Sequence, residues 1–225
     1  MEPAPVVGEY LHLFETSWDE SLGWENARFV VLDTESTGLD PRRDRVVSIG
    51  AVSSVCMELH LEDTFEVFMP IAHNTSAVHI HGITREMAAE RAIPEPDALA
   101  AFLRFLRDGV IVGHHVRHDV AMLENACREH LGLDRMPNLV VDTMELTLRL
   151  EDLGRMTRNP FEERPDFSLD GLCRRFGIPP YDRHTAVGDA FLTGQIYLKL
   201  LKRAKRAGLL RLGQLTEPYE SPKDT

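Results

Sequence analysis

Runs of hydrophobic residues separated by turn-forming residues divide the first half of the chain into predicted strands. A continuous apolar run covers residues 29–32, and a second covers residues 46–52. Runs of this length are typical of buried strands, and Gly38 and Pro41 between them indicate a turn. We therefore expect the first two strands to be neighbours. A third strand is predicted over residues 61–69, before the loop that contains His79 to Thr84.

In the second half, short apolar runs alternate with stretches whose apolar residues recur at helical spacing. The predicted elements are a helix from residue 97, strands at 110–113 and 139–141, and helices at 120–130, 169–176 and 186–205. Strands that alternate with helices indicate parallel strands added to a sheet that begins with a hairpin. The sequence therefore predicts an α/β fold. Residues 151–167, with Pro160 and Pro165, are expected to form a loop.

The same pattern suggests one domain with short appendages. Regular apolar spacing begins only at Phe29, so residues 1–27 are interpreted as an N-terminal extension, residues 28–206 as the catalytic domain and residues 207–225 as a C-terminal tail. The chain has 225 residues, of which 43% are hydrophobic. This is enough for a single domain with a substantial core.

Several features favour a soluble, unexported protein. The chain starts without a basic leader, and no segment approaches the roughly 18 apolar residues that a membrane span needs. Cys56, Cys127 and Cys173 are widely spaced and never form a C-x-x-C pair. This spacing argues against both a disulfide framework and a thiolate metal site. We therefore expect a cytoplasmic protein with no membrane partner.

The net charge limits the ways in which the protein could bind nucleic acid. Acidic residues number 36 and basic residues 25, which gives a net charge of −11. Proteins that bind long duplexes tightly and without specificity usually carry a basic surface. Local binding through dications held among carboxylates remains compatible with an acidic chain.

Two acidic residues at the end of the first strand are the first candidates for such a site. Successive strand residues point to opposite faces, so Asp33 and Glu35 project to one side and could hold a dication. The alternative is two polar residues where a strand leaves the core. For an isolated D-x-E motif that alternative is the more common one.

Asp119 and Asp189 are acidic residues on otherwise apolar helix faces. Asp119 shares a face with Leu123 and Ala126, and Asp189 begins a stripe that continues through Ile196. The alternative for Asp119 is an N-terminal helix position, where a carboxylate is favoured by the helix dipole. For Asp189 a non-functional interpretation is weaker than for Asp119, because a buried charge without a partner is costly.

His184 precedes Asp189 by five residues, about 140° around an ideal helix. Both can face one site only if His184 lies before or at the helix start, and Gly177 and Pro179 make a loop there plausible. An isolated exposed histidine is usually a surface residue. Beside converging carboxylates, however, an imidazole could accept a proton from water near neutral pH.

Taken together, these residues resemble the motifs of the DnaQ-like, or DEDDh, exonucleases, a family that includes the proofreading epsilon subunit of bacterial DNA polymerase III. The resemblance covers about Phe29 to Leu200. The matching segments, in order, are residues 31–38, 78–84, 113–119, 168–173 and 184–190. The first, third and fifth resemble the three exonuclease motifs, and the others resemble a His-Gly-Ile-Thr loop and a Ser-Leu-Asp-x-Leu-Cys helix start.

The resemblance implies a ribonuclease H-like fold, a five-stranded mixed sheet flanked by helices. It also implies that Asp33 bridges two Mg²⁺ or Mn²⁺ ions about 3.5–4 Å apart. Glu35 and Asp189 would complete the site of one ion, and Asp119 would hold the other. His184 would deprotonate the attacking water, and nucleoside 5′-monophosphates would be released.

Substrate contacts follow less directly from the resemblance. Ser36, Thr37 and His81 are candidate contacts to the terminal nucleotide, with an alternative role as turn or loop residues. In the second motif, His115 and His118 stand where the family has Asn and Phe. Because the Phe position contacts substrate in the family, the substrate preference is open.

The sequence therefore predicts a 3′-to-5′ exonuclease acting on single-stranded 3′ ends, with DNA favoured over RNA. The alternatives are an exoribonuclease that trims RNA 3′ ends and a non-catalytic nucleic-acid-binding module on the same fold. DNA repair is one candidate role, and a polymerase or another protein is a candidate partner. The short tail weakens a role in replicative proofreading, because the epsilon subunit carries its polymerase-binding segment there.

Overall fold

The fold is built on one mixed sheet. The computed structural model describes residues 2–16, 19–157 and 165–220. Within these ranges five strands lie in the order β3-β2-β1-β4-β5. They are β1 (Phe29–Ser36), β2 (Val46–Val55), β3 (Glu58–Phe68), β4 (Val110–Gly113) and β5 (Val140–Asp142). β1, β2 and β3 are antiparallel neighbours, whereas β4 and β5 run parallel to β1. The predicted hairpin with parallel additions is confirmed.

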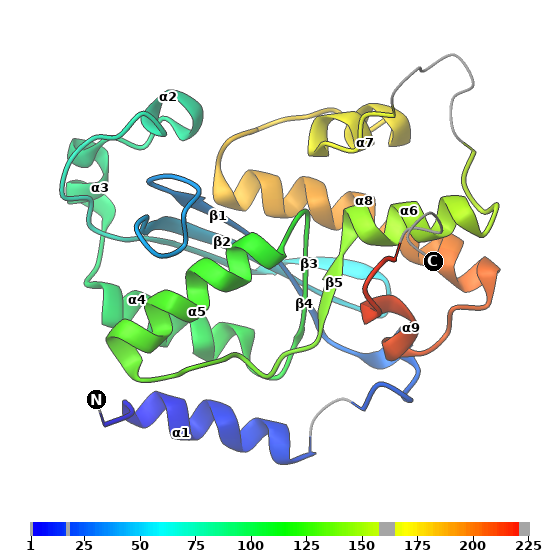
Figure 1. Ribbon diagram of the computed structural model, residues 1–225, viewed down its shortest axis with the longest axis horizontal. Coiled ribbons are helices and arrows are strands. Elements are labelled where there is room, and N and C mark those ends of the chain that lie inside the picture. The colour runs from blue at the N-terminus through cyan, green and yellow to red at the C-terminus, as the bar shows by residue number, and fades with distance from the viewer. Residues whose placement is uncertain (1, 17–18, 158–164, 221–225) are drawn as a thin grey trace.

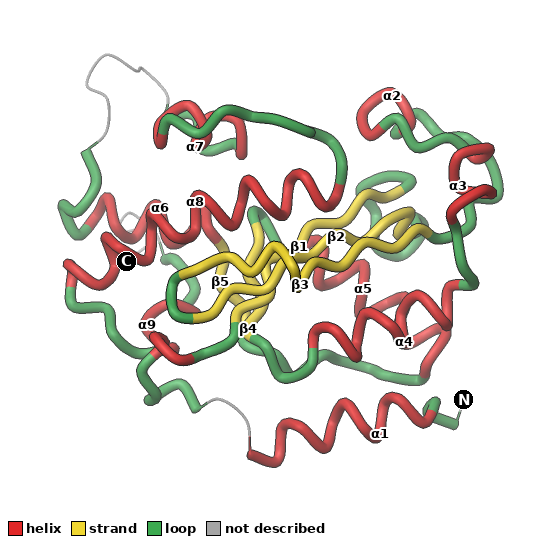
Figure 2. Tube along the Cα trace, turned by 180° about the vertical axis from the view of Figure 1, so that it is seen from behind, coloured by secondary structure: helices red, strands yellow, loops and turns green. Residues whose placement is uncertain are grey.

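Helices cover both faces of this sheet (Figures 1 and 2). One face packs against α4 (Glu95–Leu106) and α5 (Arg117–Leu131), with α1 (Pro5–His12) outside α4. The other face packs against α8 (Ala186–Ala207), which contacts α6 and α7 in turn. The remaining helical elements are α2 (Val78–His81), α3 (Arg85–Arg91), α6 (Thr143–Asp152), α7 (Leu169–Phe176), α9 (Leu212–Thr216), η1 (Leu13–Thr16) and η2 (Trp24–Asn26).

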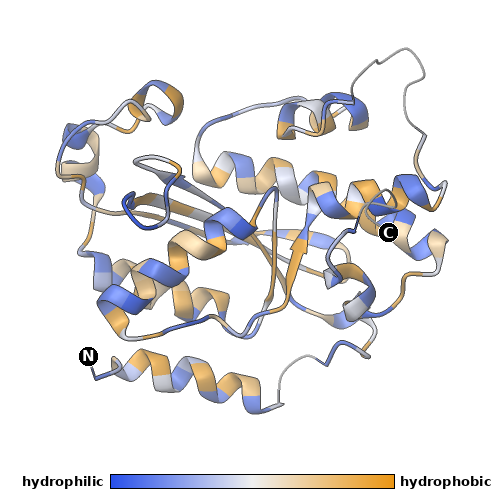
Figure 3. Cartoon of the chain, viewed as in Figure 1, coloured by the Kyte–Doolittle hydropathy of each residue, from blue (hydrophilic) through white to orange (hydrophobic). Residues whose placement is uncertain are grey.

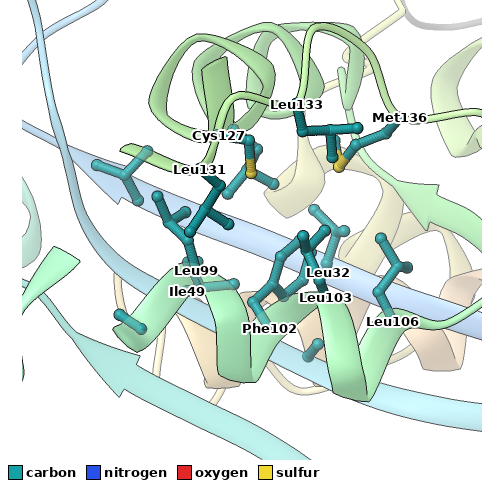
Figure 4. Close-up of a cluster of buried hydrophobic side chains, with 14 of the residues drawn as sticks. Leu32, Ile49, Leu99, Phe102, Leu103, Leu106, Cys127, Leu131, Leu133 and Met136 are labelled. Atoms are coloured by element: carbon teal, nitrogen blue, oxygen red, sulfur yellow. The ribbon is translucent and has the colours of Figure 1, made fainter. Parts of the chain in front are cut away.

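Alternate residues of β1 enter two separate cores. Val30 and Leu32 belong to the core under α4 and α5, and Figure 4 shows Leu32 among Leu99, Phe102 and Leu103. Phe29 and Val31 belong to the core under α8. This alternation follows from the pleat of a strand. The same alternation therefore fixes the side of the sheet on which the acidic residues that come next on β1 lie.

Most predicted elements are confirmed, with shifted boundaries. The strand predicted at 61–69 is Glu58–Phe68, and the helix predicted at 186–205 is Ala186–Ala207. The helices α1, α2, α6 and α9 were not predicted, and α2 lies where a loop containing His79 to Thr84 was expected. The predicted loop at 151–167 includes the end of α6, and its residues 158–164 lie outside the described residues.

The predicted N-terminal extension packs onto the domain where it is described. Val6, Val7 and Tyr10 of α1 are buried, and the Tyr10 hydroxyl donates a hydrogen bond to Asn138 Oδ1. Trp24 is fully buried, and its Nε1 donates to the carbonyl of Leu209 at 2.7 Å. Through this hydrogen bond, the predicted N-terminal extension contacts the predicted C-terminal tail. Figure 3 shows hydrophobic residues alternating with hydrophilic ones along α1. The domain boundaries remain predictions.

No helix in the described part of the chain is a candidate membrane span. None of its helices combines the length and the hydropathy that crossing a membrane requires.

Candidate active site

Three carboxylates meet where β1 leaves the core. Asp33 and Glu35 come from the end of β1, and Asp189 comes from the first turn of α8. One oxygen from each residue lies within 4.8 Å of the others. Asp33 and Glu35 follow the alternation of Phe29 and Val31, which face α8. The expectation that the two β1 carboxylates project to one side is confirmed.

The approach of α8 to the sheet depends on a glycine. Gly50 of β2 pairs with Asp33 in the sheet register. A Cβ atom at Gly50 would lie 2.1 Å from the backbone nitrogen of Val187 and 2.2 Å from the carbonyl carbon of Ala186. Only a residue without a side chain leaves room for the start of α8 at this place. The close packing brings Asp189 to Asp33.

Asp119 lies beside this cluster and is held from the opposite side of β1. Its Oδ1 accepts hydrogen bonds from the backbone nitrogen of Thr34 at 3.0 Å and from Thr34 Oγ1 at 2.6 Å. Asp119 is 8% exposed and is not among the three carboxylates that converge within 4.8 Å. Burial on the face shared with Leu123 is confirmed. A metal-binding role for Asp119 stays a prediction.

Burial raises the pKa values of Asp33, Glu35 and Asp119, and repulsion between carboxylates adds to the rise at Asp33 and Glu35. Desolvation is the largest cause for Asp33, whose pKa is raised well above its usual value, followed by repulsion from Asp119, Asp189 and Glu35. The pKa of Glu35 is raised to about 7 by burial and then by Asp189 and Asp119. The pKa of Asp119 rises to about 6 through burial, and the Thr34 hydrogen bonds oppose that rise. The cluster favours a cation or protons.

The donor atoms fit a divalent cation such as Mg²⁺ or Mn²⁺. Both ions prefer oxygen ligands, and carboxylates from three residues converge here. Asp189 Oδ1 is buried and has no hydrogen-bond partner among the described residues. An unpaired buried carboxylate oxygen is costly unless a cation contacts it. Asp33, Glu35 and Asp189 would therefore hold such an ion.

His184 contacts this cluster through its backbone. It is exposed, and it precedes Thr185, the N-cap residue of α8, as the sequence required. Its backbone nitrogen donates to Asp189 Oδ2 at 3.3 Å. Its φ of 64° is in the left-handed region, which is uncommon outside glycine and often marks a constrained site. The position of His184 fits a base that meets water, and that role stays a prediction.

The two histidines that replace the family's Asn and Phe in the second motif have different surroundings. His115 is exposed and has a φ of 56°, whereas His118 is half-buried next to Asp119. The neighbouring His114 is also half-buried, and its Nδ1 lies 3.0 Å from Thr143 Oγ1. Burial lowers the pKa of His114 to about 4, so its ring is neutral near pH 7.

The predicted substrate contacts make hydrogen bonds within their own loops. Ser36 Oγ donates to the carbonyl of Gly38 at 2.6 Å, and Thr37 Oγ1 donates to Asp44 Oδ1 at 3.0 Å. His81 is buried, and its Nδ1 accepts from the backbone nitrogen of Ile83 at 3.0 Å. The turn and loop roles named as alternatives are therefore present, and contact with substrate stays a prediction.

Four residues of the site were not singled out from the sequence. They are Thr34, Gly50, Asp170 and Arg183. Thr34 stands between the two acids of the D-x-E motif, so strand alternation alone places it on the side opposite to them. The other three act through contacts between distant elements, which local pattern does not reveal.

Comparison with known proteins supplies the family. The family model described as "Exonuclease" matches residues 30–197. The chain belongs to this exonuclease family. The chain is also similar to PolC-type DNA polymerase III of Thermotoga petrophila, with 32% identity over 211 residues. The corresponding protein of Bacillus subtilis is 30% identical over 195 residues. The matched exonuclease segment of these relatives is DnaQ-like, so the predicted resemblance is confirmed.

The chain spans only a small part of the length of these relatives. The match covers 93% of this chain but 14% of the Thermotoga protein, and 86% of this chain but 13% of the Bacillus protein. E. coli Exonuclease I in complex with a dT13 oligonucleotide superposes with a TM-score of 0.68 at 21% identity, covering 80% of this chain and 42% of that one. The ribonuclease H-like fold expected for the family is confirmed.

Proposed function

We propose that this chain is a 3′-to-5′ exonuclease that hydrolyses the terminal phosphodiester bond of single-stranded DNA and releases nucleoside 5′-monophosphates. The observation that carries this proposal is the convergence of Asp33, Glu35 and Asp189 within 4.8 Å, beside Asp119 and an exposed His184. Membership of the exonuclease family supports the same chemistry.

The proposed cofactor is a pair of Mg²⁺ or Mn²⁺ ions. Asp33, Glu35 and Asp189 would hold one ion, and Asp119 next to them would contribute to the other. When bound, such ions polarise the phosphodiester, promote ionisation of water and stabilise the charge on the leaving oxygen.

The protein's own residues account for the proton transfer. The attacking water oxygen forms a bond to phosphorus, and the bond from phosphorus to the 3′ oxygen of the preceding nucleotide breaks. His184 accepts the proton of the attacking water, because an imidazole is a base near neutral pH. The leaving 3′ oxygen is protonated from solvent. The products are one nucleoside 5′-monophosphate and a chain one nucleotide shorter.

The choice of DNA over RNA rests on the relatives. The curated relatives are named as DNA polymerases, and solved structures of Exonuclease I contain DNA oligonucleotides. These names also support a DNA polymerase as the partner of this domain. The net charge of −11 favours a short contact with a terminus over a long contact with duplex.

A side-by-side digestion tests the proposal. Metal-replete protein is mixed with linear single-stranded DNA, RNA of the same sequence and a covalently closed circle of the same DNA, each internally labelled. The proposal expects release from linear DNA, slower release from RNA and an intact circle. Cleavage of the circle would replace the exonuclease with an endonuclease, and preferential release from RNA would favour the exoribonuclease. Binding without hydrolysis of any substrate would favour the non-catalytic module.

A further inference from the structure

An arginine contacts one acid of the cluster and connects two helices. Arg183 Nε donates to Asp170 Oδ1 at 2.7 Å, and Arg183 Nη2 lies 3.4 Å from Asp170 Oδ2. Arg183 Nη1 donates to Asp189 Oδ2. Asp170 is in the first turn of α7 and Asp189 in the first turn of α8. The side chains of Arg183 and Asp189 are 19% and 9% exposed, so their contact is largely removed from solvent, whereas the Asp170 side chain is 44% exposed.

Because of these contacts, the two carboxylate oxygens of Asp189 have different surroundings. Oδ2 accepts from Arg183 and from the backbone nitrogen of His184 at 3.3 Å. Oδ1 is buried and has no partner among the described residues. With one oxygen held by two donors, rotation of the carboxylate is restricted. The other oxygen stays available to a cation.

The same contacts fix the segment that carries His184. Arg183 immediately precedes this histidine, and its guanidinium anchors the segment to both helices. The Thr185 hydroxyl donates to the carbonyl of Asp182 at 2.9 Å, which adds a hydrogen bond across the two residues between them. A Cβ atom on Gly188 would lie 2.1 Å from that carbonyl, so the segment packs tightly on the first turn of α8.

We propose that Arg183 is a positioning residue, which orients the Asp189 carboxylate toward the metal and holds His184 in place, with Asp170 as its anchor. The part that concerns the metal depends only on the carboxylate cluster. The part that concerns His184 rests on the proposed function. In metal sites, residues that hold the ligands typically change metal affinity or activity by about 10–100-fold when they are altered.

The geometry distinguishes this role from simple charge balance. The guanidinium contacts Asp170 with two nitrogens and Asp189 with the third, and a lysine ammonium cannot reproduce such a fork. If Arg183 only offset negative charge, lysine would replace it. Complete removal of the charge would then strengthen cation binding, because one repulsive positive charge would be gone. Positioning predicts weaker binding in both cases.

The experiment measures Mn²⁺ binding by titration calorimetry for Arg183→Lys, Arg183→Gln and Asp170→Asn, with Arg174→Lys as the matched control. Arg174 is also on α7 and pairs with Asp166, but its side chain is 67% exposed. Positioning predicts that the first three variants bind Mn²⁺ about 10–100-fold more weakly than wild type. The control should bind normally. Because Asp170→Asn retains Arg183 and all the proposed metal ligands, it tests the role even if an Arg183 variant fails to fold.

Two further readouts complete the test. The double variant Asp170→Asn with Arg183→Gln should be no worse than the worse single variant, because both changes remove one connection. In the exonuclease assay, kcat should fall for these variants while KM stays within about twofold of wild type. Unchanged or tighter Mn²⁺ binding by Arg183→Lys and Asp170→Asn would overturn the proposal. If wild type binds Mn²⁺ but releases no nucleotides, the proposed function fails, and the calorimetric comparison still decides the role of Arg183 at Asp189.

Discussion

Thr34 and Asp119 are joined by two hydrogen bonds across the end of β1, from the backbone nitrogen at 3.0 Å and from Oγ1 at 2.6 Å. Both bonds end on Asp119 Oδ1. They favour the charged carboxylate and oppose the rise in its pKa that burial causes. Thr34 therefore favours the ionised form of Asp119, against the rise in pKa that burial causes.

Thr34→Val should raise the pKa of Asp119 further above about 6. Valine has nearly the same shape as threonine but lacks the hydroxyl donor. The rate of nucleotide release should then rise with pH along a curve displaced to higher pH. Unfolding at pH 8 should cost about 1–3 kcal/mol less than in wild type, since a hydrogen bond to a charged group is lost. Rate profiles and denaturant melts measure both effects.

Thr64→Val is the matched control for this change. Thr64 lies on β3, and its hydroxyl donates to the backbone carbonyl of Leu61. The control should leave the pH profile unchanged. An unshifted profile in Thr34→Val as well would show that the Thr34 hydroxyl has no part in the ionisation of Asp119.

Metal-free protein should become less stable as pH rises from about 4.5 to 7. The pKa of Glu35 is about 7 in the folded protein and about 4.3 in an unfolded chain, so the folded state binds the extra proton in this window. Stability then falls as pH rises, by about 1.4 kcal/mol per pH unit for each excess proton. Asp33 should act in the same direction, because its pKa is also raised.

Denaturant melts in chelator, at intervals between pH 4.5 and 7, measure this slope. Glu35→Gln removes one titrating group and should make the decline shallower than in wild type. Saturating Mn²⁺ should reduce the decline, because metal binding favours the deprotonated carboxylates. Identical slopes for wild type and Glu35→Gln in chelator would mean that Glu35 titrates normally in the folded state.

Gly50→Ala should separate α8 from the sheet. The new methyl group would meet backbone atoms of Ala186 and Val187, which cannot move aside as the end of a flexible side chain can. We expect a loss of stability of about 1–3 kcal/mol or more. Mn²⁺ binding should also weaken, because Asp189 follows the displaced helix. Thermal melts and metal titrations test both expectations.

Gly8→Ala is the control for this substitution. Gly8 is in α1, where an added Cβ atom meets nothing within 4 Å. Alanine in a helix interior should stabilise the protein by about 0.5–1 kcal/mol. Equal effects of the two substitutions on Mn²⁺ binding would contradict a special role for Gly50.

His184→Ala should lower the rate of nucleotide release by about 10²–10⁴-fold, as expected for loss of a general base. Mn²⁺ binding should change little, since the backbone nitrogen of residue 184 that contacts Asp189 remains. His79→Ala, a change at an exposed histidine of the short helix α2, provides a histidine control. A near-normal rate for His184→Ala at pH 7 would identify His184 as a surface residue.

The sequence was sufficient for the strands and helices that carry the site. The first half of β1, residues 29–32, and β4 are continuous apolar runs, and the buried face of α8 at Asp189, Thr193 and Ile196 follows directly from helical spacing. The helix α6 was missed although its start carries a recognisable cap. Asp142 accepts hydrogen bonds from the backbone nitrogens of Met144 and Glu145. Asp142 with an acidic residue three positions later is typical of a helix start.

The site was predicted less completely than the fold, for a physical reason. Alternation along a strand placed Asp33 and Glu35 together, and helical spacing placed Asp189 on a buried face. Arg183 and Gly50, by contrast, act through neighbours that come from other elements. Neither the pairing of Arg183 with Asp170 nor the contact of Gly50 with α8 has a local sequence pattern.

Product analysis of wild type and Asp33→Asn tests directly whether the carboxylate cluster supports 3′-to-5′ exonuclease activity. Both proteins are incubated with 5′-labelled single-stranded DNA in Mn²⁺, and the products are separated by length and weighed by mass spectrometry. Wild type should release nucleoside 5′-monophosphates and leave labelled chains shortened one nucleotide at a time. Asp33→Asn, which lacks one of the three converging carboxylates, should be nearly inactive and still folded. Equal activity of the two proteins, or the release of nucleotides from the labelled 5′ end, would contradict this expectation.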